Sequence, residues 1–169
     1  MYVRGLVRGS ANKKLRPLGR RGFTLLEIVI VIAIVAILAV GVIFILNPAD
    51  QLARARNNER RAHLNTLINA IGQNSADHNG IFNCATGPIP TATTTMADNN
   101  PGAGEYNIAP CLVPIYLQTL PFDPASTTSS YINTSDYNTG YNIARNSTTG
   151  RITLGAPAAE AGEVITVIR

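Results

Sequence analysis

The chain has 169 residues, of which 46% are hydrophobic and 14% are charged, a length that suits one compact domain with an accessory segment. Its formal net charge of +4 is unevenly distributed, because seven of its fourteen Lys and Arg residues precede residue 22 and no acidic residue does. From residue 23 onward, seven basic residues face ten acidic ones, a formal charge of −3 (7 − 10), which does not favour a nucleic-acid-binding protein.

A basic segment, residues 1–22, is followed directly by an apolar segment, residues 23–46. Within the latter, residues 28–46 are nineteen consecutive residues without a charged or strongly polar side chain. A helix of this length spans about 28 Å at about 1.5 Å per residue, close to the roughly 30 Å hydrocarbon core of a bilayer. The positive-inside rule then places residues 1–22 in the cytoplasm and the chain after about residue 47 outside.

An ordinary secretory signal peptide is the alternative interpretation of this segment. It requires an apolar core of about 7–15 residues and a small-x-small cleavage site, which Ala39-Val40-Gly41 matches weakly. The apolar run continues to Leu46, however, and the acidic residue Glu27 lies inside the apolar segment. Both features favour a membrane anchor.

A helical pattern resumes after Pro48, which removes one backbone donor and clashes with the carbonyl of Phe44, so a kink is expected there. One helix over about residues 24–72 is predicted, with Gly72 as its C-cap. The charged residues at 54–61 are expected to face solvent or another protein. The apolar positions of the second half follow the spacing of one buried helix face: Leu64, Leu67, Ile68 and Ile71.

The remainder is rich in Thr, Asn, Gly, Ser and Pro and contains short β-prone segments. The predicted strands are residues 130–133, 140–144, 151–154 and 163–168. We therefore predict an α+β fold, in which a long N-terminal helix, first transmembrane and then amphipathic, packs on a small antiparallel sheet. The predicted organisation is a leader at 1–22, a transmembrane helix at 23–46, its amphipathic continuation at 47–73 and an extracytoplasmic globular domain at 74–169.

The segment with the most specific chemistry is the junction between the basic and apolar segments, Arg-Arg-Gly-Phe-Thr-Leu-Leu-Glu at residues 20–27. A carboxylate at the centre of a membrane helix costs on the order of 2–3 kcal/mol, so such a residue is usually retained for a partner. Cleavage between Gly22 and Phe23 would create an α-amine four residues before Glu27. Pairing of that amine with a carboxylate on a neighbouring helix would set an axial stagger. If no cleavage occurs, Glu27 is a carboxylate that reaches water at the membrane interface.

This junction resembles the class III signal sequence of the type IV pilin and type II secretion pseudopilin family, over about residues 20–46. The resemblance implies that a prepilin peptidase cuts after Gly22 and N-methylates Phe23. It implies that Glu27 neutralises the new amine of an adjacent subunit, and Thr24, at a position that is commonly polar, is assigned to assembly with it. An assembly ATPase and an inner-membrane platform protein would extract subunits from the membrane lipid into a filament. The 22-residue leader is longer than in many members.

A second, weaker resemblance lies in the segment Leu-Pro-Phe-Asp-Pro at residues 120–124, which is similar to the segment before the sheet of major pseudopilins. Its two prolines and Asp123 indicate a rigid turn. Loops after this segment bind calcium in some pseudopilins. Asp136, Asn133 and Asn138 offer oxygen ligands here, without EF-hand spacing, so calcium remains an alternative and no metal site is predicted.

Cys84 and Cys111 are the two cysteines, and both fall in the part predicted to be exported. An even number of cysteines in an oxidising compartment predicts a disulfide, whereas two free thiols are the alternative if the compartment does not oxidise them. A bridge would close a loop rich in Gly, Pro and Thr that has little apolar content of its own.

Catalytic motifs are absent from the sequence: it contains no Gly-x-Ser-x-Gly, no phosphate-binding loop and no cluster of paired carboxylates. His63 and His78 lack the spacing of a metal pair and are expected to be surface residues. The predicted function is a structural subunit of a type IV pilus or pseudopilus, not an enzyme, without direct nucleic-acid binding. The alternative is a membrane-tethered extracytoplasmic binding protein that uses the same leader without polymerising.

Overall fold

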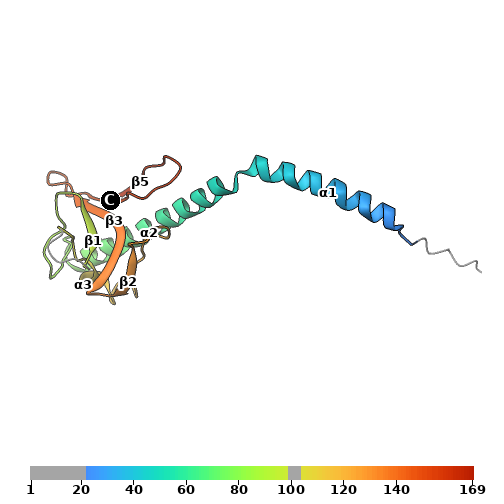
Figure 1. Ribbon diagram of the computed structural model, residues 1–169. Coiled ribbons are helices and arrows are strands. Elements are labelled where there is room, and N and C mark those ends of the chain that lie inside the picture. Colours follow the sequence, from blue (N-terminus) through green and yellow to red (C-terminus); the bar gives the residue numbers. More distant parts are fainter. Residues whose placement is uncertain (1–21, 99–103) are drawn as a thin grey trace, which may run out of the picture. The chain divides into compact units, whose positions relative to one another are not determined.

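The structure is a computed structural model that describes residues 22–98 and 104–169 (Figure 1). The chain divides into two compact units, Met1–Ile45 and Leu46–Arg169. The described part of the first unit is almost entirely one helix, whereas the second contains a helix, a sheet and the loops between them.

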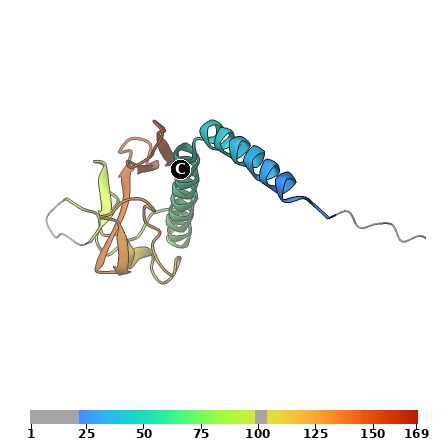
Figure 2. The same ribbon diagram turned by 45° about the vertical axis from the view of Figure 1, so that its right-hand side comes forward.

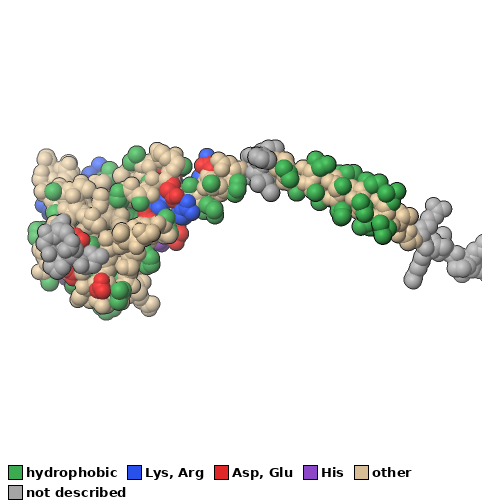
Figure 3. Space-filling model, viewed as in Figure 1, with side chains coloured by type: hydrophobic (Ala, Val, Ile, Leu, Met, Phe, Trp, Pro, Cys, Tyr) green, Lys and Arg blue, Asp and Glu red, His purple; other side chains and the backbone are tan. Residues whose placement is uncertain are grey.

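Helix α1, Leu25–Leu46, forms the first unit and carries one charged residue, Glu27. An 18-residue stretch of it, Leu25–Val42, is long and apolar enough to cross a membrane, and none of this stretch is buried within the chain. Apolar side chains cover the visible surface of α1 in the space-filling view (Figure 3). A helix that is apolar all round belongs in lipid or inside a protein assembly.

Helix α2, Pro48–Asp77, begins after a break at Asn47, whose left-handed backbone (φ 39°, ψ 76°) ends the preceding helical hydrogen-bond pattern. Pro48 occupies the first helical position, where the lack of an N–H costs nothing. The predicted interruption at Asn47-Pro48 is confirmed. The predicted C-cap at Gly72 is wrong, because α2 continues for five more residues to Asp77.

The sheet has five antiparallel strands in the order β1-β3-β4-β5, with β2 also paired to β3. Its strands are β1, Thr94–Ala97; β2, Ser130–Asn133; β3, Asp136–Arg145; β4, Ile152–Ala156; and β5, Ile165–Ile168. All four predicted strands are present: the strand at 130–133 has the predicted bounds, and the other three have shifted ends. Strand β1 was missed, because its Thr-Thr-Met-Ala sequence has no clear apolar alternation.

Strand β3 is the centre of the sheet, since β1 pairs along one of its edges while β2 and β4 pair with its two ends. Between the segments paired to β2 and β4, Thr139 accepts a backbone hydrogen bond from Asp123 at 2.8 Å. The predicted turn at 120–124 therefore inserts beside β3 at this point. Gly140, with φ +71°, lies next to it, and a side chain there would collide with Ser129 and approach Cβ of Asp123 to 3.1 Å.

The core of the second unit lies between α2 and the sheet (Figure 2). Every apolar position predicted for the buried face of α2 is at most 4% exposed. These residues pack with Tyr137, Tyr141 and Ile143 of β3, with Leu154 of β4, and with the short helix α3, Ala109–Leu112. The α+β class and the packing of a helix on a small antiparallel sheet are confirmed.

Candidate functional site

The peptide bond between Gly22 and Phe23 lies immediately before α1, in residues without helical or strand structure. Phe23 is 78% exposed, and a Cβ atom added at Gly22 would meet no other atom within 4 Å. Within the part of the chain that the structure describes, the predicted cleavage junction is open to a second protein.

Thr24 is the N-cap of α1. Its carbonyl accepts the N–H of Ile28 at 3.2 Å, the first hydrogen bond of the helix, and its Oγ1 accepts the N–H of Glu27 at 3.2 Å. A threonine that accepts from the third helical residue satisfies one of the donors that every helix start leaves unpaired. The spacing Thr-x-x-Glu is that of a capping box. The family resemblance had implied a role for Thr24 in assembly, at a commonly polar position, and no role as a helix cap.

Glu27 is the acidic residue in the first turn of α1, where a negative charge interacts favourably with the helix dipole. Its side chain is exposed and has no hydrogen-bond or ion-pair partner among the described residues. Apolar side chains that follow it along the helix, such as Ile28 and Val31, are about half exposed. The structure thus places one carboxylate at the start of an uncovered apolar helix.

A buried ion pair attaches α2 to the rest of the second unit. Arg60 donates from Nε to Oδ2 of Asp123 at 2.7 Å and from Nη2 to Oδ1 at 3.0 Å, and both side chains are at most 1% exposed. Asp123 also accepts the backbone N–H groups of Ala125 and Ser126. The expectation that residue 60 faces solvent or another protein is therefore wrong.

The same arginine also reaches the loop between β4 and β5. Its Nη1 donates to Oε2 of Glu160 at 2.9 Å, and Arg56 donates to both carboxylate oxygens of Glu160 at 2.7 and 2.6 Å. We call Arg56, Arg60, Asp123 and Glu160 the arginine–carboxylate cluster. Nearby, Asn57 exchanges two hydrogen bonds with the backbone of Glu160.

The remaining arginines of residues 54–61 are paired as well. Arg61 donates to Glu163 in the β4–β5 loop, and Arg54 pairs with Asp50 one turn earlier in α2. Each of the four arginines in this stretch therefore has a carboxylate partner within the chain.

These contacts shift the titration of both carboxylates in the cluster. Burial alone would raise the pKa of Asp123, but the hydrogen bonds from Arg60 and from two backbone N–H groups hold its pKa below the ordinary value of 3.8. The hydrogen bonds from Arg56 and Arg60 lower the pKa of Glu160 to about 2. Both groups are therefore ionised at neutral pH.

The sequence contained a signal for the buried arginine. Arg60 precedes Leu64 by four residues and Leu67 by seven, so it lies on the same helix face as the predicted core positions. The prediction nevertheless placed Arg60 on an exposed surface, because the residue is charged. No spacing rule, by contrast, pointed to its partner Asp123, 63 residues away.

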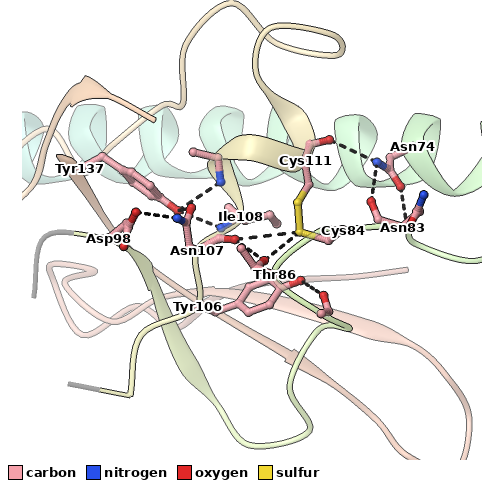
Figure 4. The surroundings of a disulfide bond; sticks show 12 residues. Asn74, Asn83, Cys84, Thr86, Asp98, Tyr106, Asn107, Ile108, Cys111 and Tyr137 are labelled. Atoms are coloured by element: carbon pink, nitrogen blue, oxygen red, sulfur yellow. Dashed lines mark hydrogen bonds between the residues drawn. A yellow bond between two sulfur atoms is a disulfide. The ribbon is translucent and has the colours of Figure 1, made fainter. Parts of the chain in front are cut away.

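Cys84 and Cys111 are joined by a disulfide, the pairing that the sequence predicted (Figure 4). Asn74 of α2 supports both ends of the bridge, because its Nδ2 donates to the carbonyls of Asn83 and Cys111 at 3.0 and 3.2 Å. Its Oδ1 accepts the N–H of Asn83 at 2.8 Å. The bridge therefore joins the loop before β1 to helix α3, and Asn74 attaches both to the end of α2.

The hydroxyl of Tyr137 organises the other side of this region, as Figure 4 shows. It accepts the N–H groups of Ile108 and Ala109 at 2.8 and 3.2 Å and donates to Oδ1 of Asn107 at 3.1 Å. Burial raises the pKa of Tyr137 to about 12. The phenol therefore stays protonated and bound at the start of α3.

Two of the three residues considered for calcium use their side-chain oxygens in local turns. Asn133 accepts the N–H of Ser135 at 2.7 Å, and Asn138 accepts the N–H of Gly140 at 2.8 Å. Asn133 and Asp136 face each other as a pair in the β2–β3 hairpin. In the described ranges, no group of three His, Cys, Asp or Glu side chains is placed to hold a metal.

The two histidines lie apart, and each forms a hydrogen bond to a different element of the second unit. Nδ1 of His63 lies 2.9 Å from the hydroxyl of Tyr141, and Nδ1 of His78 lies 2.7 Å from the carbonyl of Asn74. His63 is therefore attached to the sheet and His78 to the end of its own helix.

Comparison with known proteins adds one finding. Residues 18–43 match the family model of the prokaryotic N-terminal methylation motif. No curated protein and no solved structure matches the chain at a significant level. The matched residues include the junction, the N-cap, Glu27 and most of α1, and together with that apolar helix they indicate a membrane-anchored protein. Residues 18–43 are thus a class III signal peptide of the kind found in type IV pilins, which makes the chain prepilin-like, and its fold is consistent with that of pilins.

Proposed function

We propose that this chain is a structural subunit of a type IV pilus or pseudopilus that is cut between Gly22 and Phe23 and polymerises through α1. The observation that carries the proposal is the coincidence of the methylation motif with an exposed junction and with an apolar helix of which residues 25–42 are unburied. The proposed role is structural and not catalytic.

Processing would change both the charge and the terminus of the chain. Hydrolysis of the amide leaves a carboxylate on Gly22 and an amine on Phe23. A methyl group from a sulfonium methyl donor then replaces one proton of that amine, and the donor leaves as a thioether. A prepilin peptidase would perform both steps. The leader takes seven basic residues with it, so the mature subunit carries a formal charge of −3 (7 − 10).

Assembly would use the carboxylate at the start of α1. The methylated amine of one subunit and Glu27 of its neighbour carry opposite charges, and their attraction strengthens as water is excluded between apolar helices. Such a buried polar pair fixes the axial register of packed helices. The other partners would be an assembly ATPase and an inner-membrane platform protein.

Location follows from the same proposal. Before assembly, α1 spans the cytoplasmic (inner) membrane once, in contact with lipid, and the second unit lies outside. After assembly, the subunit belongs to an extracellular or periplasmic filament. Residues 1–22, before they are removed, would be the cytoplasmic leader. Residues 74–169 would be the extracytoplasmic globular domain at both stages.

Two substitutions at Glu27 test the proposal. Glu27→Ala removes the charge and the side chain, whereas Glu27→Gln removes only the charge, because glutamine is also accepted at the third position of a capping box. Both variants should be cut and methylated normally but should yield few or no sheared surface fibres. Normal fibres from Glu27→Gln would contradict the proposed assembly step.

The alternative, a membrane-tethered binding protein with a prepilin leader, predicts a different result for the wild-type chain. The chain would be cut and anchored but would not appear in sheared fibres at any expression level. The same shearing assay therefore separates the two functions.

A further inference from the structure

We infer that Thr24 is a positioning residue for cleavage between Gly22 and Phe23, because its side chain fixes the first residue of α1 and keeps the Gly22 carbonyl outside the helix. This inference rests on the proposed function, since it concerns the cleavage proposed there. The conformation in question is the backbone conformation of Gly22 and Phe23 when the peptidase binds the chain.

The hydrogen bonds at the start of α1 define where the helix begins. Thr24 contributes two of them, through its carbonyl to Ile28 N–H and through Oγ1 to Glu27 N–H, both at 3.2 Å. Among the described side chains of the first unit, no other is bonded to a backbone N–H group. The side chain of Thr24 therefore holds the boundary of the helix at Leu25.

An earlier start is chemically available to this sequence. Gly22 is an acceptable N-cap residue, and Phe23 tolerates helical geometry. A helix that began at Phe23 would use the Gly22 carbonyl to accept the N–H of Leu26, four residues later. The carbonyl that must be attacked during cleavage would then be fixed in the first hydrogen bond of the helix.

A peptidase has to reach the carbonyl carbon on one side of the bond and the nitrogen on the other. In the structure, both residues of this bond are non-helical and exposed, and Gly22 has no neighbour within 4 Å of a built Cβ. The N-cap at Thr24 provides this arrangement while placing Glu27 in the first helical turn. The same hydrogen bond would remain after cleavage, so the new amine of Phe23 would also stay outside the helix.

Three substitutions separate capping from other roles of the threonine. Thr24→Val keeps the shape but removes the acceptor oxygen, Thr24→Ser keeps a hydroxyl, and Thr24→Asn replaces the hydroxyl by the amide of a residue that also caps helices well. The full-length chain is reconstituted in detergent with a prepilin peptidase. Initial cleavage rates are read from the mass of the released product, and hydrogen exchange of the Glu27 amide reports the cap.

Thr24→Val should be cut about fivefold more slowly than wild type and should exchange the Glu27 amide faster, in line with the usual strength of an N-cap. Thr24→Ser and Thr24→Asn should stay within about twofold of wild type in both measurements, because both retain an acceptor. Cleavage of Thr24→Val at the wild-type rate would overturn the inference, as would unchanged exchange of the Glu27 amide in that variant. Cleavage of Thr24→Asn as slow as that of Thr24→Val would overturn it too, because the peptidase would then be recognising the threonine side chain itself. If the wild-type chain is not cut at this bond, the proposed function fails and not only this inference.

Discussion

The two units of this chain differ in the exposure of their apolar side chains, which form a buried core in the second unit and are exposed in the described part of the first. In the second unit, apolar side chains of α2 and β3 such as Leu64, Leu67 and Tyr141 are completely buried. In the first unit, α1 is more apolar than α2, yet Ile37 is 74% exposed and Leu38 is 64% exposed. Substitutions in the second unit should therefore change the stability of the fold, and substitutions in α1 should change what the chain associates with.

The same contrast holds for charge. The second unit surrounds its buried cation, Arg60, with two carboxylates and Asn57. The first unit presents Glu27 without a described partner. The second unit satisfies this buried charge internally, whereas Glu27 has no partner among the described residues and suits the proposed contact between chains.

Arg60→Ala should produce the largest loss of stability, because it leaves Asp123 buried without its cation. Breaking a buried pair in this way typically costs about 3–5 kcal/mol. Arg54→Ala is the matched control, and it should cost under about 1 kcal/mol because Arg54 pairs with Asp50 at the surface. The measurement is denaturant unfolding of the full chain in detergent, followed by the near-UV signal of its tyrosines. Equal effects of the two substitutions would show that burial does not distinguish these ion pairs.

Removal of the disulfide should rank next. Replacing Cys84 and Cys111 together by serine frees a loop with a sequence separation of 27. The chain-entropy relation gives about 3–4 kcal/mol for a loop of this size. The same unfolding assay, combined with limited proteolysis, should show faster cutting between the two positions. Unchanged unfolding midpoints would contradict the assigned role of the bridge.

Two glycines of the second unit should respond in opposite ways to alanine. Gly140→Ala places a side chain at φ +71° against Ser129 and Asp123, so about 2–4 kcal/mol of destabilisation is expected. At Gly72 the added Cβ meets only the guanidinium of Arg169, the mobile end of a long side chain. Gly72→Ala should therefore be neutral or stabilising by up to about 1 kcal/mol, because alanine favours the helix. Thermal unfolding midpoints of the two variants measure this difference.

Acid should weaken the second unit through the arginine–carboxylate cluster. The pKa of Asp123 is lowered, and that of Glu160 is lowered from 4.5 to about 2, so the folded chain binds fewer protons than the unfolded chain between those values. Stability is therefore fully present above about pH 4.5 and decreases as the pH falls towards 2. Unfolding midpoints between pH 6 and pH 2 test this, and Glu160→Gln should flatten the decline.

Val35→Ala in α1 should have the smallest effect on the fold. Val35 is 56% exposed within the chain, so its truncation should change the unfolding of the second unit by less than about 0.5 kcal/mol. Its effect should appear instead in the yield of sheared fibres. A loss of second-unit stability would show that the first unit contributes to that core.

Local patterns in the sequence were enough to predict the apolar helix α1, the buried face of α2 and the four strands. Helix α1 is an uninterrupted apolar run, the apolar residues of α2 follow the helical period, and the strands are short β-prone segments. Local patterns also placed the helix break at Asn47-Pro48, since proline has a fixed backbone requirement. The end of α2 was predicted too early, because Gly72 looks like a cap but accommodates the side chain of Arg169.

The arginine–carboxylate cluster could not be predicted, because its members lie up to 104 residues apart and meet only through the tertiary fold. The methylation motif at 18–43 matched the predicted resemblance. The role of Thr24 became apparent only with the geometry of the helix start, although the spacing from Thr24 to Glu27 was present in the sequence. Local rules identified the elements, and the contacts between distant elements came from the structure.

Intact mass and N-terminal sequencing of the chain recovered from sheared fibres test the central claim most directly. The account predicts a chain of residues 23–169 whose first residue is N-methylated Phe23 and which is present in those fibres at a level that Glu27→Gln strongly reduces. Recovery of an uncut chain, of a chain cut after Gly41, or of no chain in any fibre would contradict it.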